Sequence, residues 1–470
     1  MNLLEIREDQ MFLPSGDVIT FNDEQFLGIK RINKWLSEDD NLFFVLAGYA
    51  GTGKTTMLKK ILDGYDDRVV VTAPTHKAKN IISQLTNMPA QTLHSLLGLR
   101  PDLDLDDFNP NKPIFNPIAP PKIHKYDFLI VDEASMINYN LFSLITDLAK
   151  STKVLFVGDP AQIPPVGEKA SYVFINDDIP KHQLTKIERQ NLENPLCSVY
   201  TSLRNNLYDP NSGISRITKL DENKQGIEFT TNKKHFRRKL LKMFLSDEFK
   251  KNRNYCKVIA WRNITIRLSN KIIRQYLFNK SNDIVLKGDL LMGYRHITSG
   301  INKPLIEISS EYEVVLRSDI RKNRYGIYGY DVKIKENITG KYFYVFIVDS
   351  NVRENLDLYQ TKHDKLIKDA LKNRKLWSRY YEFRRNNLLL INIDRYPDGS
   401  QRPERDIIKK DLDYGYGITA HKSQGSTYEH VFVMEDDINL NPLIKERNQI
   451  KYVALTRPSK SATVLTNQIF

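Results

Sequence analysis

The first third of the chain alternates short, largely apolar runs with segments in which apolar residues recur at helical spacing. The runs do not alternate with polar residues, which is typical of strands buried on both faces of a parallel sheet. The four runs are 42–47, 68–73, 128–131 and 153–157. Helical spacing follows the first run at 57–62, and a polar helical stretch, 77–85, follows the second. The pattern predicts a parallel α/β sheet.

Residues 99–125 interrupt this alternation. They hold six prolines, an acidic run at 102–107 and two isolated aromatic residues, Phe108 and Phe115. Proline removes a backbone donor and is confined to edges and turns of sheets. We therefore expect a short insertion on the sheet in place of a strand or helix of it.

A second α/β pattern begins near residue 190 and is itself interrupted. Its expected strands are 256–260, 417–420, 430–433 and 462–466, with a basic helix at 267–278. Strand-like pieces separated by Gly and Asn occupy 312–316, 328–334 and 341–348, and a basic, aromatic helix is expected over 353–385. The order indicates a small β-rich domain inserted into a second α/β domain.

The fold class predicted from these patterns is α/β, with two parallel-sheet domains. We expect the first domain over 1–190, including the 99–125 insertion. The second is expected to combine 191–290 with 405–470, and the inserted β-rich domain to cover 291–404. A chain of 470 residues is long enough for about three domains.

Net charge and cysteine content indicate which partners and cofactors are compatible with the chain. Seventy Lys and Arg against 57 Asp and Glu give a net charge of +13, which favours a polyanionic partner such as nucleic acid, although a basic soluble surface remains an alternative. Cys197 and Cys256 have no metal-ligand spacing and support neither zinc nor a disulfide framework. No apolar run reaches the length of a membrane span, and the acidic N-terminus lacks a signal-peptide core. We expect a cytoplasmic protein with no membrane contact.

Residues 48–55 read Gly-Tyr-Ala-Gly-Thr-Gly-Lys-Thr, a complete phosphate-binding loop between an expected strand and an expected helix. The glycines let backbone N–H groups turn toward an oxyanion, Lys54 reaches the outer phosphates, and the Thr55 hydroxyl can bind Mg²⁺. The helix that follows places its N-terminus at the phosphates. An ordinary glycine turn is the alternative, and the strand and helix around the loop argue against it.

Two further expected strands are followed by residues that can take part in catalysis. Asp132 and Glu133 follow the run at 128–131, where a carboxylate faces the same crevice as the loop. Asp132 can hold Mg²⁺ and Glu133 can deprotonate an attacking water. The alternative is that the two carboxylates only cap the N-terminus of a helix. Gln162 ends the segment 158–162 after the next strand, and it can contact the outermost phosphate or the attacking water.

Taken together, these motifs resemble those of the superfamily 1 DNA helicases. The set also includes Phe-Asn-Asp-Glu-Gln at 21–25, Ala-Pro-Thr-His-Lys-Ala at 73–78, Thr-Leu-His-Ser at 92–95, Leu-Thr-Lys-Ile-Glu-Arg-Gln at 184–190, Thr-Ala-His-Lys-Ser-Gln-Gly-Ser-Thr at 419–427 and Tyr-Val-Ala-Leu-Thr-Arg at 452–457. The chain is most similar to the Dda-type phage helicases within the RecD-like branch. The resemblance runs over nearly the whole chain and implies two RecA-like domains and an SH3-like insertion.

For the nucleotide, the resemblance implies ATP with Mg²⁺. Gln25 matches the glutamine that reads the adenine edge, and Arg189 and Arg457 match arginines that reach the γ-phosphate. A surface salt bridge is the alternative for each arginine. The implied catalytic residues are Lys54, Asp132, Glu133, Gln162, Arg189 and Arg457; the implied nucleotide contacts are Gln25, Gly48, Ala50, Gly51, Thr52, Gly53, Lys54, Thr55, Thr56 and Gly425; the implied metal ligands are Thr55 and Asp132.

For DNA, the resemblance implies contacts along a single strand from residues of both α/β domains. They are Pro74, Thr75, His76, Thr92, His94, Thr419 and His421, whose polar groups suit phosphates, although buried, satisfied side chains are an alternative. Trp261 departs from the smaller polar residue expected at its position, and stacking on a base or core packing both remain open. Phe108 or Phe115 is a candidate for the residue that separates base pairs. The basic segment 353–385 either contacts a displaced strand or packs on the β-rich domain.

The function implied is that of an ATP-dependent DNA helicase, 5′ to 3′ in direction by analogy with the branch, on single-stranded DNA and single-strand/duplex junctions. We expect a monomer in the cytoplasm (of the host, if the source is viral), with single-strand-binding or replication proteins as further partners. The alternatives are an ATPase that translocates or remodels protein–DNA complexes without processive unwinding, a kinase with the same loop, and a DNA-binding protein with an inactive site. Tailed partial duplexes distinguish the helicase from the translocase.

Overall fold

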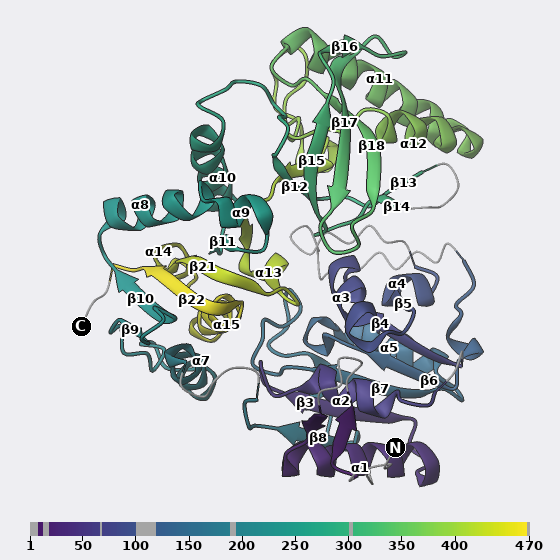
Figure 1. The fold of residues 1–470 in the computed structure, drawn as a ribbon. Coiled ribbons are helices and arrows are strands. Elements are labelled where there is room, and N and C mark those ends of the chain that lie inside the picture. Colours follow the sequence, from purple (N-terminus) through teal and green to yellow (C-terminus); the bar gives the residue numbers. More distant parts are fainter. Residues whose placement is uncertain are drawn as a thin grey trace, which may run out of the picture. The chain divides into compact units, whose positions relative to one another are not determined.

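The computed structural model describes residues 8–12, 18–65, 68–99, 119–188, 194–299 and 304–467. The chain divides into two compact units (Figure 1). Unit 1 combines Met1–Thr231 with Ser423–Phe470, and unit 2 is Asn232–Lys422. The Phe108, Phe115 and Arg189 predictions lie outside the described residues.

Unit 1 contains a parallel sheet of six strands in the order β5-β4-β6-β7-β3-β8. Their bounds are Ala90–Thr92, Val69–Ala73, Phe128–Val131, Lys153–Gly158, Phe43–Gly48 and Lys181–Leu184. Alternate residues of one strand enter different cores: Val45 packs in one cluster and Phe44 and Leu46 in the other. Both faces are therefore buried, which is why these strands read as continuous apolar runs.

Helices cover both faces of this sheet and are joined to its strands by the loops. Their bounds are α1 Asp23–Glu38, α2 Lys54–Ile61, α3 His76–Thr86, α4 Leu93–Leu96, α5 Tyr139–Leu148 and α6 Tyr172–Ile175, with short 3₁₀ turns η1 Ile123–Lys125 and η2 Ala134–Met136. A two-stranded antiparallel hairpin, β1 (Gln10–Phe12) with β2 (Val18–Thr20), precedes α1. Asn22 and Gln25 cap α1 reciprocally through their side chains, as a capping box does.

The C-terminal part of unit 1 adds a second set of strands. Strand β22 (Pro458–Leu465) lies between β10 (Gly226–Thr230) and β21 (Tyr428–Met434), and both pairings are parallel. Strand β9 (Lys219–Leu220) pairs antiparallel with β10. The helices here are α7 Pro195–Asn205, α14 Glu435–Ile438 and α15 Ile444–Leu455. Helix α15 leads directly toward Thr456 and Arg457.

Unit 2 holds a parallel pair of strands with three helices and an antiparallel sheet. The pair is β11 (Cys256–Ala260) with β20 (Gly417–Thr419). The helices are α8 Lys233–Phe244, α9 Asp247–Lys251 and α10 Asn263–Leu277. Among the described residues, no helix combines the length and the apolarity that crossing a lipid bilayer requires.

The antiparallel sheet of unit 2 has the order β16-β17-β15-β12-β19, and β18 also pairs with β17. The bounds are Arg321–Lys322, Tyr328–Glu336, Glu311–Arg317, Leu290–Gly293, Leu412–Tyr414 and Tyr342–Val348. A hairpin, β13 (Ile297–Thr298) with β14 (Pro304–Ile306), adjoins it. Helices α11 (Arg353–Lys372) and α12 (Trp377–Arg385) follow β18, with turns η3 Arg374–Leu376 and η4 Glu404–Asp406. Tyr359 and Phe383 of the two helices share a core with Phe346 of the sheet.

The α/β class with parallel strands is confirmed, and each strand expected from an apolar run is present. One expectation is wrong: 353–385 is not a single helix. Asn373 adopts an extended conformation between α11 and α12, and its side chain accepts a hydrogen bond from the Lys375 N–H. The SH3-like character of the insertion and the domain boundaries at 190, 290 and 405 stay predictions.

Candidate nucleotide-binding site

The loop between β3 and α2 is a tight turn that requires its glycines. Gly51 and Gly53 have φ of 80° and 79°, in the left-handed region that side chains disfavour. A Cβ on Gly53 would lie 2.3 Å from Nε2 of Gln25. The turn is closed by the Thr52 hydroxyl, which donates to the Tyr49 carbonyl at 2.9 Å. The sequence pattern and the backbone therefore agree on a phosphate-binding conformation.

Lys54 begins α2 and folds back over the loop. Its Nζ donates to the carbonyls of Gly48 at 2.6 Å and Tyr49 at 3.0 Å. The first turn of α2 contains no acidic residue, so its N–H groups and the partial positive charge of the helix are not neutralised there. These features fit the phosphates of a nucleotide.

Three carboxyl groups lie deep in the site, at the carboxyl ends of β6 and β7. They belong to Asp132, Glu133 and Asp159. Burial of the carboxyl group, together with the negative charge of Asp132, raises the pKa of Glu133 to about 7. Burial also raises the pKa of Asp132 and of Asp159. Carboxylate oxygens are ligands that a divalent cation prefers, and a cation bound beside Asp132 would favour the charged forms of these groups.

Glu133 also has an unusual backbone conformation. Its φ of 54° lies in the left-handed region although it is not glycine or asparagine. This geometry costs about 1 to 3 kcal/mol and persists where surrounding contacts impose it. The side chain is directed to Gly425: a Cβ on that glycine would lie 3.3 Å from Oε1 of Glu133. A residue larger than glycine at 425 would therefore crowd the carboxylate.

The C-terminal segment provides the opposite wall of the site. Arg457 is buried, and its guanidinium donates to the carbonyls of Val453 at 3.0 Å and Ser426 at 3.3 Å. Burial lowers the pKa of Arg457, while the negative charge of Glu133 favours the cationic form of the arginine. Gln424 donates to Oε1 of Gln162 at 3.3 Å. The residues near 160 and those after 420 thus form one hydrogen-bonded wall.

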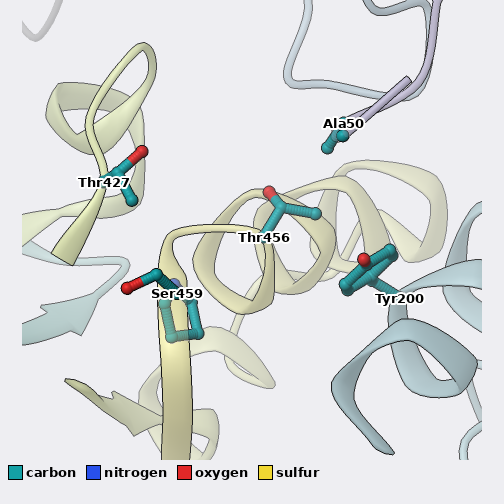
Figure 2. A pocket seen from close by; sticks show the side chains of 7 residues that line it. Ala50, Tyr200, Thr427, Thr456 and Ser459 are labelled. Atoms are coloured by element: carbon teal, nitrogen blue, oxygen red, sulfur yellow. The ribbon is translucent and has the colours of Figure 1, made fainter. Parts of the chain in front are cut away.

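These elements line an open cavity of about 620 Å³. Its lining includes most of the nucleotide residues predicted from the sequence, which are Gln25, Ala50, Gly51, Thr52, Gly53, Lys54, Thr55, Thr56, Asp132, Glu133, Gln162, Gly425 and Arg457. Met11, Ile19 and Ile82 add an apolar side. A smaller pocket of about 20 Å³ adjoins the loop, with Ala50, Tyr200 and Thr456 around it (Figure 2), which is room for about one water molecule.

Gln25 makes contacts that the sequence pattern did not reveal. Its Oε1 accepts from the Asn22 N–H at 3.0 Å, and its Nε2 donates to the Thr52 carbonyl at 3.0 Å. The side chain therefore ties the start of α1 to the phosphate-binding loop. One N–H and one lone pair remain for a base, so adenine reading stays a prediction.

Sequence reasoning missed two residues of the site. Asp159 is fully buried, and its Oδ1 accepts from the Ala161 N–H at 2.9 Å. Tyr452 of α15 contacts both Asp159 and the backbone of Ala50. Both lie inside motifs that the sequence reveals, but their neighbours carry the more familiar chemistry. The apolar wall from β1, β2 and α3 was missed because single hydrophobic residues at separate positions give no motif.

Comparison with known proteins agrees with this site. A family model described as an AAA domain matches residues 22–217. The ATP-dependent DNA helicase Dda of Enterobacteria phage T4 is 29% identical over 52% of this chain and 54% of Dda. The ATP-dependent RecD2 DNA helicase of Deinococcus radiodurans is 34% identical over 36% of this chain and 24% of RecD2. In sequence, the chain is therefore similar to ATP-dependent DNA helicases of the Dda and RecD2 type.

Other comparisons cover nearly the whole chain. The uncharacterized protein R530 of Acanthamoeba polyphaga mimivirus is 25% identical over 94% of this chain and 98% of its own length. The crystal structure of a Pif1 helicase from Bacteroides, in complex with ADP-AlF3 and ssDNA, has a TM-score of 0.52 and 16% identity, covering 96% of this chain and 93% of that one. The likeness in fold therefore extends beyond the residues that the AAA domain model matches.

The DNA-contact residues that this helicase resemblance implies in unit 1 lie at the carboxyl ends of β4 and β5. The hydroxyl of Thr75 accepts from the Ala78 N–H at 3.1 Å and caps α3. The hydroxyl of Thr92 accepts from the Ser95 N–H at 3.3 Å and caps α4. Burial, with the nearby charge of His76, lowers the pKa of His94 to about 4, so this imidazole is neutral at pH 7. Pro74 adjoins them at the end of β4.

The remaining predicted DNA-contact residues lie in unit 2. Thr419 ends β20 and is buried, and His421 lies in the short helix α13 (Ala420–Ser423). Ala260 pairs with Thr419 in adjacent parallel strands, so Trp261 follows β11 at the same edge as these residues. Trp261 is half-buried. Stacking of a base on it stays a prediction.

Proposed function

We propose that this protein is an ATP-dependent DNA helicase that translocates 5′ to 3′ along single-stranded DNA. The observation that carries the proposal is the shared cavity. The phosphate-binding loop, the carboxyl groups of Asp132 and Glu133, and Arg457 line one space, and the buried Asp159 adjoins it, although Lys54 and Arg457 are far apart in the sequence. Dda and RecD2, both named ATP-dependent DNA helicases, support the assignment.

Each residue of the site has its own role in the proposed hydrolysis of ATP. Lys54 exchanges its contacts with the loop carbonyls for the outer phosphates, and the N–H groups at the start of α2 hold those phosphates. Glu133 accepts the proton of the attacking water, for which a pKa near neutrality is suitable, and Gln162 orients that water. Arg457 stabilises the charge that develops on the transferred phosphoryl group.

Thr55 and Asp132 would hold Mg²⁺, which supplies neutralisation of phosphate charge when it is bound. The raised pKa values of the three carboxyl groups support this assignment, because nearby protein cations do not fully offset the burial. Arg189 is proposed as a second arginine at the γ-phosphate.

Single-stranded DNA is proposed to run past the carboxyl ends of the strands in each α/β part. Pro74, Thr75, His76, Thr92 and His94 form one group, and Trp261, Thr419 and His421 form the other. The hydroxyls of Thr75 and Thr92 accept from the backbone at the starts of α3 and α4, and their own O–H groups can donate to a backbone phosphate. Phe108 or Phe115 would separate base pairs at a junction.

The protein is proposed to work as a monomer in the cytoplasm, which is that of a host if the source is viral. A phage relative and a mimivirus relative support a viral source. Single-strand-binding and replication proteins are proposed as its further partners.

Strand displacement on matched partial duplexes tests the proposal. One substrate carries a 5′ single-stranded tail and the other a 3′ tail, with ATP and Mg²⁺ present. We expect displacement from the 5′ tail only. Unwinding from the 3′ tail alone would overturn the direction, and unwinding of neither would favour a translocase that remodels protein–DNA complexes.

A loop variant makes the test specific to the nucleotide site. Lys54→Ala removes the cation that faces the phosphates, and we expect ATP hydrolysis to fall on the order of 100-fold or more. Lys34→Ala on α1 removes an exposed lysine far from the loop and serves as the matched control. Unchanged unwinding by Lys54→Ala would contradict the assignment of the site.

A further inference from the structure

Helix α8 of unit 2, labelled in Figure 1, has one apolar face, and half of its twelve residues are Lys or Arg. Phe236, Leu240 and Phe244 recur four residues apart and are buried. Asn232 caps the helix, and its side chain accepts from the N–H groups of Lys234 and His235 at 3.0 Å each. Packing and capping therefore account for the existence of the helix and for one of its faces.

The opposite face of α8 carries a stripe of cations. Its twelve residues include six Lys and Arg and no Asp or Glu. Lys234, Arg238 and Lys242 recur four residues apart, directly opposite the buried stripe, and all three are exposed. Like charges at this spacing destabilise a helix by about 0.2 to 0.5 kcal/mol per pair. The helix therefore keeps a charge pattern that opposes its own stability.

The surroundings of the stripe do not neutralise it. Among the described residues, Lys234, Arg238 and Lys242 form no ion pair, and Asp247 of the following helix is bound to Lys250 at 2.7 Å. Helix α10 adds the exposed cations Arg267 and Lys271. By contrast, in α11 an acidic residue interrupts the basic ones: Asp364 binds Arg402 at 2.7 Å.

An exposed aromatic ring lies beside the stripe. Tyr276 of α10 is 46% exposed, and the guanidinium carbon of Arg237 lies 5.4 Å from its ring centre. The Arg237 guanidinium also donates to the Tyr276 hydroxyl at 3.3 Å. An arginine held on a tyrosine ring keeps its remaining N–H donors directed outward in a fixed position.

We propose that the outer face of α8, together with Arg237 and Tyr276, binds the phosphodiester backbone of a nucleic acid. From Lys234 to Lys242 the stripe is about 12 Å long, which matches a few successive phosphates of one DNA strand. Trp261 precedes α10 and Tyr276 is near its end, about 20 Å further along that helix, so the surface is distinct from the predicted single-strand track. The inference rests on the proposed function, because a helicase is the reason for DNA to be present.

A charge-removal series on the full-length protein tests this surface. The triple variant Lys234→Gln, Arg238→Gln, Lys242→Gln is compared with Lys34→Gln, Lys150→Gln, Lys219→Gln, which removes three exposed charges outside the predicted DNA contacts. Fluorescence anisotropy gives the affinity for single-stranded, duplex and forked DNA at about 50 to 200 mM salt. We expect the α8 variant to reduce the slope of log K against log salt by about 2 to 3 on at least one of the three DNAs, and the control variant by less than about 1.

Two outcomes overturn the proposal. Equal slopes for wild type and the α8 variant on all three DNAs show that the stripe contacts no phosphate, and equal losses in both triple variants show an effect of net charge alone. Thermal unfolding controls for the fold, and removal of like charges should leave the melting temperature unchanged or higher. Lys234→Arg with Lys242→Arg should retain the wild-type slope.

ATP hydrolysis separates this proposal from the helicase assignment. With a short single strand at saturation, the α8 variant should hydrolyse ATP at the wild-type rate. If the wild-type protein itself shows no DNA-stimulated hydrolysis, the proposed function fails. If stimulation is normal and the salt slope does not change with the α8 variant, only the assignment of the α8 surface fails.

Discussion

The hydroxyl of Tyr452 donates a hydrogen bond to Oδ2 of Asp159 at 2.7 Å and accepts one from the Ala50 N–H at 3.0 Å. One phenol thus joins helix α15, the end of β7 and the phosphate-binding loop. Tyr452 lies little more than one helical turn before Arg457, so the position of the arginine and the shape of the loop depend on the same contact.

Tyr452→Phe removes this contact while keeping the ring. The Ala50 N–H and the buried Asp159 carboxyl then lose a partner, and we expect the free energy of unfolding to fall by about 1 to 3 kcal/mol. The kcat for ATP should fall more than KM rises, because the arginine wall is displaced. Urea unfolding and steady-state hydrolysis measure both effects, and Tyr208→Phe at an exposed ring is the control. Normal kcat in Tyr452→Phe would contradict a positioning role.

Glu133→Gln tests the raised pKa of this carboxyl. The pKa rises from its ordinary value near 4.5 to about 7 on folding, so the folded state binds the additional proton between these values. Ionisation of Glu133 therefore destabilises the nucleotide-free fold as pH rises from about 4.5 to 7, and the loss is complete above 7. The variant should lack this decline and be more stable at pH 8 by roughly 1 to 3 kcal/mol.

The same Glu133→Gln variant should be nearly inactive in ATP hydrolysis, with a loss on the order of 100-fold to 10,000-fold, because the proton acceptor is gone. Urea unfolding from pH 4 to pH 8 and hydrolysis at pH 8 together provide the two readouts. A variant that is destabilised at pH 8 would contradict an electrostatic origin of the decline.

His94→Gln tests the opposite case. Burial and the charge of His76 lower the pKa of His94 from 6.5 to about 4, so the unfolded chain binds the proton first as pH falls. This group therefore supports stability above pH 6.5, and the support is lost progressively down to about pH 4. We expect the variant to lose less stability than wild type over this window. An identical acid profile in urea unfolding would show that His94 does not titrate as proposed.

Gln25→Ala separates two roles of one side chain. Loss of its contacts with Asn22 and Thr52 should destabilise the protein by about 1 kcal/mol and raise KM for any nucleotide. If Gln25 also reads adenine, KM should rise more for ATP than for GTP. Equal rises for the two nucleotides would limit Gln25 to holding the loop. Hydrolysis of both nucleotides with saturating DNA provides the comparison.

Much of the fold and most of the nucleotide cavity could be predicted, because short-range patterns determine them. A run such as 128–131 has to be buried on both faces, and left-handed glycines at 51 and 53 have to form a turn. Long-range contacts could not be predicted in the same way. Tyr452 and Asp159 are 293 positions apart, and nothing local in either segment indicates their hydrogen bond.

The break at Asn373 was missed for a different reason. Asparagine is tolerated within helices, and only its competing contact with the Lys375 N–H shows that the chain leaves the helix there. The caps formed by Thr75 and Thr92 were likewise hidden, since the same hydroxyls suit phosphate binding equally well.

The pairing of β22 with β10 has a consequence for biosynthesis. Gly226 lies beside Ser461 in this ladder, and Arg457 precedes the strand immediately. A ribosome makes the phosphate-binding loop before the segment that carries Tyr452 and Arg457, and Ala50 and Tyr452 are 402 positions apart. A nascent chain therefore holds the loop without the arginine until residue 457 has been made. A nascent chain that lacks Arg457 is therefore expected to hydrolyse ATP more slowly than one that includes it.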